Sequence, residues 1–450
     1  MAGEGGVTDM NLRFGYGTNG FAHHRLDDAL AIIADLGYAG VALTLDHAHL
    51  DPYAPDLGHR VGRLAARLDE LGLAVVVETG ARYLLDPWHK HAPSLLDDDA
   101  PRRVEFLKRA VDIAADLGAQ AVSFFAGVRP DAVPEKTAWE RLTRGCARVA
   151  EHAADRRVTL GLEPEPGMLV ATIAEWTALN DRLDGVLGLT LDIGHCRAVE
   201  PHDVPQCVRL AGPHLVNVQI DDMRRGVHEH LEFGAGEIDF PPVLAALHEV
   251  GYTGLVAVEL PRHSHAAPQV AARSLAFLRG AQWLASAAAE ITANPERITT
   301  LFPAARRNVG RDRADQARVR LIEALPDAGA YLSDLYRYGD NDEKRAVLLA
   351  LPSVDDSGKH VDLLRDALRS NDTRLVTAAL GPYAAHLPDA EWRHGVLKCV
   401  FMGLPLAGVH DLDRRADADL GRMLADLRAE REAAGRDMPA DALALLERLA

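Results

Sequence analysis

The feature of this sequence that most limits its fold is an alternation of two patterns along its first 280 residues. Short apolar stretches, typical of strands, alternate with longer stretches whose apolar side chains recur every three or four residues, typical of amphipathic helices. Glycine follows several of the helical stretches, at Gly37, Gly72, Gly118 and Gly251, where helices commonly end. The alternation predicts an α/β fold.

The predicted strands are 12–18, 41–45, 74–78, 121–125, 158–163, 187–192, 215–220 and 255–259. The predicted helices are 26–36, 61–71, 104–117, 139–154, 173–183, 204–210, 242–250 and 267–278. Eight strands that alternate with eight helices over this length predict a (β/α)₈ barrel. The alternative is an open doubly wound sheet, whose usual cofactors need G-x-G-x-x-G after the first strand. The GYGTNG stretch lacks that spacing.

The character of the sequence changes after residue 280, where only helical patterns punctuated by proline remain. We therefore predict a disordered N-terminus over 1–11, a barrel over 12–280 and an all-α domain over 281–450. The helices of this domain could stack in pairs, but no repeat of fixed period is evident that would predict a solenoid.

Composition excludes some classes of function. The formal net charge of −17 argues against a nucleic-acid partner that is bound through its phosphates. The four cysteines show no paired spacing, which is typical of a reducing compartment. The N-terminus lacks a signal pattern and no apolar run is long enough to span a membrane, so we expect a cytoplasmic protein.

Four predicted strands end in side chains that carry a ligand oxygen: Glu163, Asp192, Gln219 and Glu259. In a parallel barrel these strand ends meet at one mouth, where buried carboxylates repel one another unless a cation neutralises them. Three carboxylates and an amide oxygen favour one divalent metal ion, Mn²⁺ or Mg²⁺ first, with Zn²⁺ or Co²⁺ as alternatives. The competing explanation is that these acids pair with arginines of the βα-loops.

Histidines follow two of these strands. Asp192 and His195 have a spacing that fits metal ligands, but it fits equally an aspartate that caps the next helix and a histidine that packs. His228 and His230 are candidates for binding a metal ion or a substrate oxygen, or for solvated loop positions. We expect the segment 89–91 to be solvated.

These motifs together resemble the sugar phosphate isomerase/epimerase superfamily, the xylose isomerase-like TIM barrel group that also holds type 2 apurinic endonucleases. The resemblance covers about residues 12–280. It rests on Glu163, D-x-G-H at 192–195, V-Q-I at 218–220, H-x-x-x-G-x-G-E-I-D-F at 230–240 and V-E-L at 258–260. Gln219 in the third ligand position most resembles the hydroxypyruvate isomerase branch, since ketose epimerases usually carry histidine there.

The resemblance implies one divalent metal ion on the four ligands named above, with Glu163 and Glu259 also moving the substrate proton. It implies that His195 and Arg225 hold substrate oxygens, and we add His228 and His230 as substrate-binding candidates. The endonuclease branch needs further histidines after the third and fourth strands, which here read VVVETGAR and VSFFAGVR.

The C-terminal part resembles the EboA-type proteins, which are helical and linked to metabolite traffic. The specific motifs are W-x-x-x-V-L-K-x-x-F-x-G-x-P-L at 392–406 and D-x-R-A at 413–416. Trp392, Val396, Leu397, Val400 and Phe401 fall on one helical face, so packing into a core is the simpler explanation for them.

We therefore expect a metal-dependent isomerase or epimerase of a small polyhydroxylated carbonyl compound, such as a sugar, a sugar phosphate or a cyclitol. The alternatives are a metabolite-binding or trafficking protein without turnover and a metal-dependent hydrolase or endonuclease. The expected partner is a small polyol or sugar, with no nucleic acid and no membrane span, and a homo-oligomer is left open.

Overall fold

The structure is a computed structural model that describes residues 10–80 and 82–449. Most of the N-terminal segment that the sequence predicts to be disordered lies outside these residues. The chain divides after residue 285 into two compact units.

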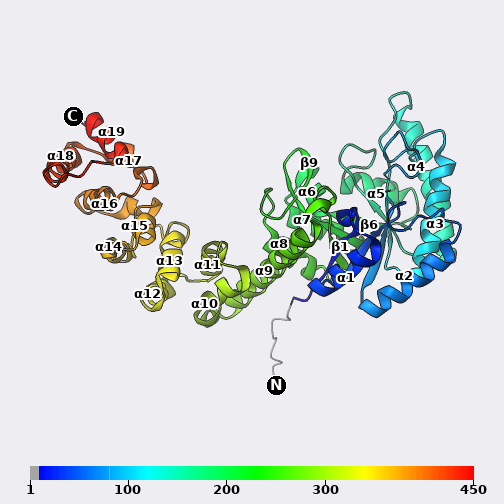
Figure 1. Cartoon of the computed structure of the whole chain (residues 1–450), viewed down its shortest axis with the longest axis horizontal. Helices are drawn as coiled ribbons and strands as arrows, with labels where there is room; N and C mark the ends of the chain where they lie inside the picture. Colours follow the sequence, from blue (N-terminus) through cyan, green and yellow to red (C-terminus); the bar gives the residue numbers. More distant parts are fainter. Residues whose placement is uncertain (1–9, 81, 450) are drawn as a thin grey trace, which may run out of the picture. The chain divides into compact units, whose positions relative to one another are not determined.

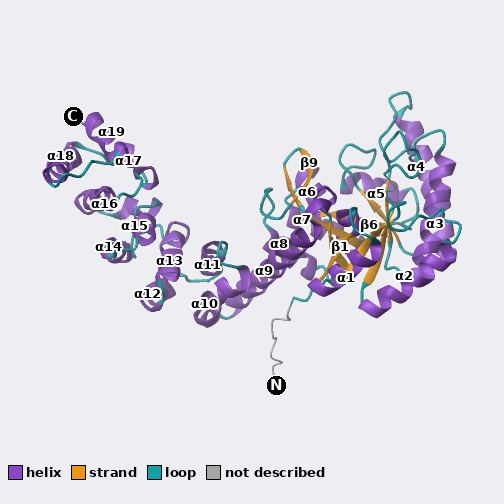
Figure 2. Ribbon diagram, in the orientation of Figure 1, coloured by secondary structure: helices purple, strands orange, loops and turns teal. Residues whose placement is uncertain are grey.

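The first unit is a closed barrel of eight parallel strands (Figures 1 and 2). Its strands are β1 (Arg13–Gly17), β2 (Gly40–Thr44), β3 (Ala74–Glu78), β4 (Val122–Phe125), β5 (Leu160–Glu163), β6 (Gly188–Asp192), β7 (Leu215–Ile220) and β10 (Leu255–Val258). Each pairs with the next along the chain, and β10 closes the ring on β1 with Leu255 opposite Arg13. The predicted (β/α)₈ barrel is confirmed.

The barrel strands alternate with helices that cover the outside. These are α1 (Leu26–Leu36), α2 (Leu57–Leu71), α3 (Ala100–Leu117), α4 (Glu135–Arg156), α5 (Ile173–Asp181), α6 (Ile193–Val199), α7 (Val204–Ala211), α8 (Phe240–Glu249) and α9 (Ala267–Ala293). Gly37, Gly72 and Gly118 end α1, α2 and α3 in the left-handed conformation, as the sequence predicts. Two insertions were not predicted: the short helix α6, and an antiparallel hairpin of β8 (Asp222–Arg224) and β9 (Val227–Leu231).

Short 3-10 turns lie at several connections. They are η1 (Thr18–Phe21), η2 (Gly212–His214), η3 (Pro261–Ala266), η4 (Pro295–Arg297), η5 (Pro382–His386) and η6 (Leu406–Gly408). Of these, η1 and η3 follow β1 and β10 directly and so lie at the C-terminal mouth of the barrel.

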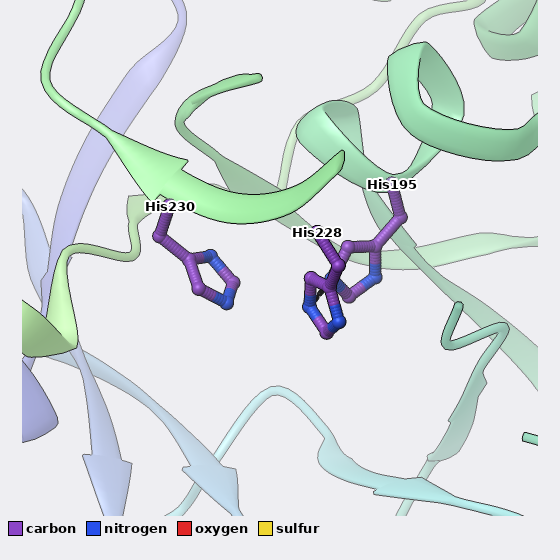
Figure 3. Close-up of side chains that lie close together, drawn as sticks. All are labelled: His195, His228 and His230. Carbon is purple, nitrogen blue, oxygen red and sulfur yellow. Dashed lines mark hydrogen bonds between the residues drawn. The ribbon is translucent and has the colours of Figure 1, made fainter. Parts of the chain in front are cut away.

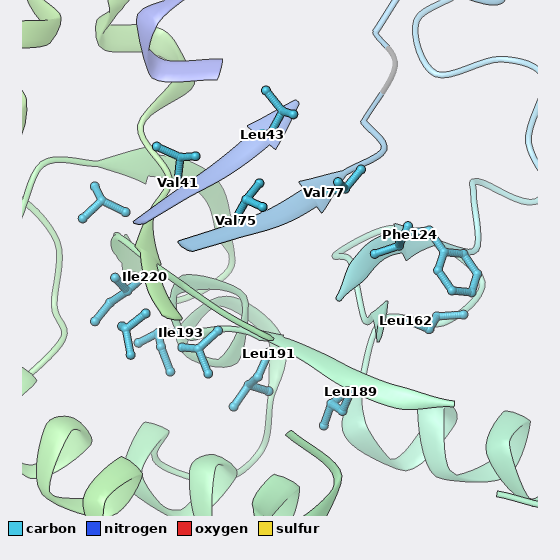
Figure 4. Packing of buried hydrophobic residues seen from close by; sticks show 14 of the residues in the cluster. Val41, Leu43, Val75, Val77, Phe124, Leu162, Leu189, Leu191, Ile193 and Ile220 are labelled. Carbon is cyan, nitrogen blue, oxygen red and sulfur yellow. The ribbon is translucent and has the colours of Figure 1, made fainter. Parts of the chain in front are cut away.

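The core of the barrel is built from strand side chains that are buried on both faces of the sheet. Figure 4 shows Val41 and Leu43 of β2 beside Val75 and Val77 of β3. Because helices cover the outer face and side chains fill the inner one, nearly every strand residue is apolar. Polar side chains inside the strands, such as Thr190 and Asn217, are few, and the acidic ones lie at the C-terminal ends, where the site is.

The second unit is helical. Its helices are α10 (Ile298–Val309), α11 (Ala314–Glu323), α12 (Gly329–Tyr338), α13 (Asn341–Val354), α14 (Val361–Arg369), α15 (Thr373–Ala379), α16 (Asp389–Met402), α17 (Leu412–Arg415), α18 (Ala418–Ala433) and α19 (Ala440–Leu449). Helices that are near in sequence pack on each other, such as α11 on α13 and α13 on α15, which gives a stack. Trp392, Val396 and Val400 are buried as expected, but Phe401 is 63% exposed because it lies one position beyond the buried stripe. No helix among the described residues is long and apolar enough to cross a membrane.

Candidate functional site

A cavity of about 520 Å³ opens at the C-terminal ends of the barrel strands. Its wall is formed by residues at the ends of β2, β3, β4, β5 and β7 and by the loops that follow β3 and β10. A more open hollow of about 1000 Å³ lies along α4, beside Glu140 and Arg182, but it contains none of the converging acids or histidines found among the described residues. The chemistry of the barrel is therefore concentrated at its mouth.

Three carboxylates converge at this mouth. Glu163 ends β5, Asp192 ends β6 and Glu259 follows β10, and oxygen atoms of the three lie within 4.8 Å of one another. The strand register explains the convergence, because Asp192 pairs with Gln219 of β7 and the Glu259 amide donates to the Ile220 carbonyl at 3.2 Å. Four residues that are far apart in sequence thus share one end of the sheet.

The two oxygens of Asp192 have different surroundings. Oδ1 accepts a hydrogen bond from the His195 amide at 2.8 Å and caps α6, whereas Oδ2 is buried without a hydrogen-bond partner among the described residues, 4.0 Å from the His195 Nε2 atom. The Gln219 Oε1 atom is also buried without a partner. A buried polar atom without a partner costs about 1–3 kcal/mol, and a divalent cation accepts such oxygens as ligands. The residues present therefore fit a metal ion.

No arginine or lysine among the described residues pairs with these three carboxylates. Glu163 contacts the His195 ring at 3.3 Å, and Glu259 accepts a hydrogen bond from the Asn19 amide at 2.9 Å. The loop arginines bind exposed acids or backbone carbonyls instead, as Arg197 does with Glu237 and Arg225 with the Glu200 carbonyl. Burial raises the pKa of the Glu163 carboxyl well above its usual range, although the contact with His195 opposes this.

Three imidazoles line the cavity next to the carboxylates (Figure 3). His195 comes from α6, and His228 and His230 come from β9, whose alternating side chains place both on one face. The Nε2 atoms of His195 and His228 are 3.0 Å apart. The geometry allows the group to hold either a metal ion or substrate oxygens.

The histidines differ in charge. Burial and the neighbouring histidines lower the pKa of His228 to about 4, so its ring is neutral near pH 7. Burial also acts against charge on His230, but a short hydrogen bond with the buried Asp221 carboxylate raises the pKa of His230 to about 9. Burial also raises the pKa of the Asp221 carboxyl well above its usual range, so the His230–Asp221 pair retains a proton near pH 7, whereas His228 can donate or accept.

A buried aspartate fixes the loop that returns from the histidine hairpin. Asp222 accepts hydrogen bonds from the amides of Gly234, Gly236 and Ile238 at 2.8, 2.9 and 3.1 Å. A Cβ on Gly236 would lie 2.2 Å from the Asp222 carboxylate, so only glycine allows this approach. The shape of this loop thus depends on the Asp222 carboxylate and the backbone amides rather than on the histidines themselves.

Arg225 does not line the cavity. Its guanidinium donates to the Glu200 carbonyl, and its amide donates to Glu237 at 3.1 Å. The structure therefore separates Arg225 from the other candidate residues, and its role in substrate binding stays a prediction.

Several residues of the cavity wall were missed by the sequence analysis. Glu78 ends β3 and accepts a hydrogen bond from Asn217 at 3.1 Å, and burial together with Glu259 raises the pKa of Glu78 to about 8. Its signal was present, because β3 is a further apolar strand that ends in a carboxylate. Lys90 and His91 also line the cavity; His89 and Lys90 are exposed as expected for the segment 89–91, but His91 is half-buried, contrary to that expectation. The fold of the loop after β3 brings these side chains to the cavity, and no pattern in the sequence predicts that fold.

Comparison with known proteins agrees with the division of the chain. Residues 30–281 match the model of the xylose isomerase-like TIM barrel family, and residues 282–447 match that of metabolite traffic protein EboA. An L-ribulose 3-epimerase of Mesorhizobium japonicum is 30% identical over 239 residues, which cover 51% of this chain and 74% of the relative. The L-ribulose-5-phosphate 3-epimerase UlaE of Shigella flexneri is 26% identical over 227 residues, covering 49% and 80%.

Solved structures share the fold. A structure of an L-ribulose 3-epimerase superposes with a TM-score of 0.52 at 24% identity and covers 63% of this chain and 98% of its own. The 3-keto-D-glucoside 4-epimerase YcjR from E. coli gives a TM-score of 0.50 at 18% identity and covers 60% and 99%. The chain therefore belongs to the xylose isomerase-like TIM barrel family, as a sugar isomerase- or epimerase-like enzyme with an EboA-like C-terminal part.

Proposed function

We propose that this enzyme moves a proton on a carbon next to the carbonyl group of a small ketose, and that one divalent cation, Mn²⁺ or Mg²⁺ with Zn²⁺ or Co²⁺ as alternatives, assists it. The proposed ligands are Glu163, Asp192, Gln219 and Glu259. The observation that carries the proposal is the convergence of three carboxylates beside two buried oxygens that lack partners. The matched ribulose 3-epimerases favour a ketose as substrate.

When bound, the cation would polarise the carbonyl and the adjacent hydroxyl group and so acidify the C–H bond between them. Glu163 and Glu259 belong to strands that are separated by β6 and β7 around the ring, so they approach the reacting carbon from different sides. One glutamate removes the proton and the other returns a proton to the opposite face, which inverts the centre without net change in hydrogen. Asn19 holds one oxygen of Glu259 and leaves the other free.

The histidines bind and orient the substrate in this proposal. The hydrogen-bonded pair of His230 and Asp221 retains a proton, so His230 donates to a substrate oxygen that gains negative charge. His195 and His228 complete the wall on that side of the cavity. Arg225, bound to the Glu200 carbonyl, would have to move to reach the substrate.

The proposal is tested by measuring metal content and hydrogen exchange separately. Glutamine keeps a ligand oxygen but cannot accept the proton. We expect Glu163→Gln and Glu259→Gln to retain substantial Mn²⁺ while deuterium incorporation from D₂O into a ketose falls at least about 100-fold. Asp192→Asn should lose metal, and Glu140→Gln, an exposed residue of α4, should change neither quantity.

If excess Mn²⁺ restores full exchange in both glutamine variants, the glutamates only hold metal and the proton-transfer role is wrong. Equal metal in wild type and Asp192→Asn would overturn the ligand assignment. Product analysis by NMR then distinguishes epimerisation at the exchanged carbon from isomerisation between two carbons.

A second candidate function is supported by the match of the C-terminal part to metabolite traffic protein EboA. In that case the barrel would bind a sugar without turnover. A ketose that binds the metal-loaded protein but incorporates no deuterium in the wild type would favour this candidate over the enzyme.

A further inference from the structure

The cavity has two walls of opposite charge. Carboxylates occupy the strand ends, whereas the loops after β3 and β10 contribute Arg82, Lys90 and Arg262. We propose that these loops form a phosphate subsite, in which Arg82 and Lys90 bind the phosphate of a phosphorylated ketose whose carbonyl end lies at the carboxylates. The inference rests on the proposed function and names the substrate class of the same site.

Arg82 and Lys90 are held close together by the backbone. The His91 amide donates to the Arg82 carbonyl at 2.6 Å and closes the loop between them. The His91 ring in turn contacts the Gly80 carbonyl and packs edge-on against Phe125, with ring centroids 5.4 Å apart. Both cations therefore belong to one ordered stretch of cavity wall.

Neither cation has an acidic partner among the described residues. Within the described residues, the Arg82 guanidinium donates a hydrogen bond to the Asn19 carbonyl, at 3.5 Å, and to no carboxylate. Lys90 makes no ion pair with any of these residues. Arg262, across the opening, pairs with the exposed Glu229 at 3.3 Å. In a chain of net charge −17, unpaired cations that face a cavity indicate a place for an anion.

A buried arginine adds to the positive potential behind this wall. Arg103 of α3 is 1% exposed, donates to the Thr79 carbonyl at 2.9 Å and stacks on Phe125. Its Nη1 atom has no hydrogen-bond partner, and no carboxylate of the described residues pairs with it. Burial and the positive charges of Lys90, Arg103 and Arg82 lower the pKa of His91 to about 4, in agreement with their clustering.

The charges favour a phosphate over a carboxylate. A phosphate monoester carries a charge of about −1.5 to −2 near neutral pH, which matches Arg82 and Lys90 with Arg262 at the rim. Guanidinium groups bind phosphate oxygens in a bidentate fork. A cavity of about 520 Å³ is within the range of small-molecule sites.

The test compares L-ribulose with L-ribulose 5-phosphate on the full-length, Mn²⁺-loaded protein. We expect kcat/KM to be at least about 10-fold higher for the phosphorylated sugar. Arg82→Ala and Lys90→Ala should each abolish most of that preference by raising KM for the phosphorylated sugar, while kcat/KM for L-ribulose changes less than about 3-fold. Arg129→Ala is the matched control, since Arg129 lies in the loop after β4, outside the cavity wall.

Calorimetry with inorganic phosphate gives a readout that does not depend on turnover. We expect binding to the wild type and its loss in the Arg82→Ala, Lys90→Ala double variant. Equal preference in wild type and variants, or phosphate binding that survives in the double variant, overturns the subsite while leaving the epimerase intact. If neither sugar exchanges deuterium, L-ribulose and its 5-phosphate are not substrates, and the calorimetry alone decides the subsite.

Discussion

The two roles that the sequence presented as alternatives for Asp192, helix cap and metal ligand, use different oxygen atoms and so do not exclude each other. One oxygen caps α6 by accepting the His195 amide, and the other faces the converging acids without a partner. Gly194, two residues after Asp192, lies in the helix α6, so its backbone conformation does not require glycine. A Cβ at this position would come within 2.0 Å of an Asp221 oxygen. Close packing under the site, rather than a turn, excludes a side chain at this position.

Glu78 gives a prediction of pH dependence for the metal-free protein. Folding raises the pKa of Glu78 from 4.5 to about 8, so the folded barrel holds this proton more tightly than the unfolded chain does. The stability contributed by Glu78 is therefore complete below about pH 4.5 and is lost as the pH rises towards 8, by at most about 1.4 kcal/mol per pH unit. In Glu78→Gln this loss is absent, so the variant should gain stability relative to wild type between pH 5 and 8.

The measurement is the denaturation midpoint of both proteins in the presence of a chelator. Asn217→Ala provides a second variant, because it removes the hydrogen bond that favours the Glu78 carboxylate. It should move the pH dependence to higher pH. Parallel midpoints for wild type and Glu78→Gln across this range would contradict the prediction.

At the scale of elements, the barrel could be predicted because each strand and helix carries its own local signal. The period of apolar residues and the glycines that end α1, α2 and α3 are sufficient to locate them. The hairpin β8–β9 and the loop after β3 carry no such periodic signal, since hydrogen bonds between individual residues of each loop, such as His91 to Arg82, fix their conformation. Residues at the strand ends could therefore be proposed as site residues, whereas Lys90 and His91 could not.

The hairpin that carries His228 and His230 depends on Asp222. Replacing it by alanine leaves three amides without their charged acceptor, so Asp222→Ala should lower the free energy of unfolding by about 3 kcal/mol. Hydrogen exchange should become faster at Gly234, Gly236 and Ile238. Glu229→Gln, on the exposed side of the same hairpin, is the control, and unchanged exchange in Asp222→Ala would show that the loop is held by other contacts.

At the scale of the whole molecule, the sequence predicts separate domains that meet at residues 280–281, and the compact units divide after residue 285. Helix α9 runs through this point, and its Ala281 and Ala285 belong to the core of the barrel. Gln282 accepts a hydrogen bond from the Leu12 amide at 3.3 Å. We propose that the barrel is an independent folding unit that needs α9 as far as Ala285.

A fragment of residues 1–293 should therefore be monodisperse and bind the same amount of Mn²⁺ per barrel as the full chain. A fragment of residues 1–279 loses two buried methyl groups and one hydrogen bond, together about 2–3 kcal/mol. Its melting temperature should be lower by about 5–10 °C. Aggregation of both fragments would show that the barrel does not fold without the helical unit.

Closure of the ring by β1 and β10 has a consequence for the synthesis of the protein. The paired residues Arg13 and Leu255 are separated by about 240 residues. At about 5–20 residues per second, the ribosome needs roughly 12 to 50 seconds to supply the partner of the first strand. During that time the amides and carbonyls along one edge of β1 are unpaired and can form hydrogen bonds with a strand of another chain. The nascent chain is therefore most prone to aggregation before its last barrel strand emerges from the ribosome. A chaperone that binds its N-terminal half would have the greatest effect in this interval.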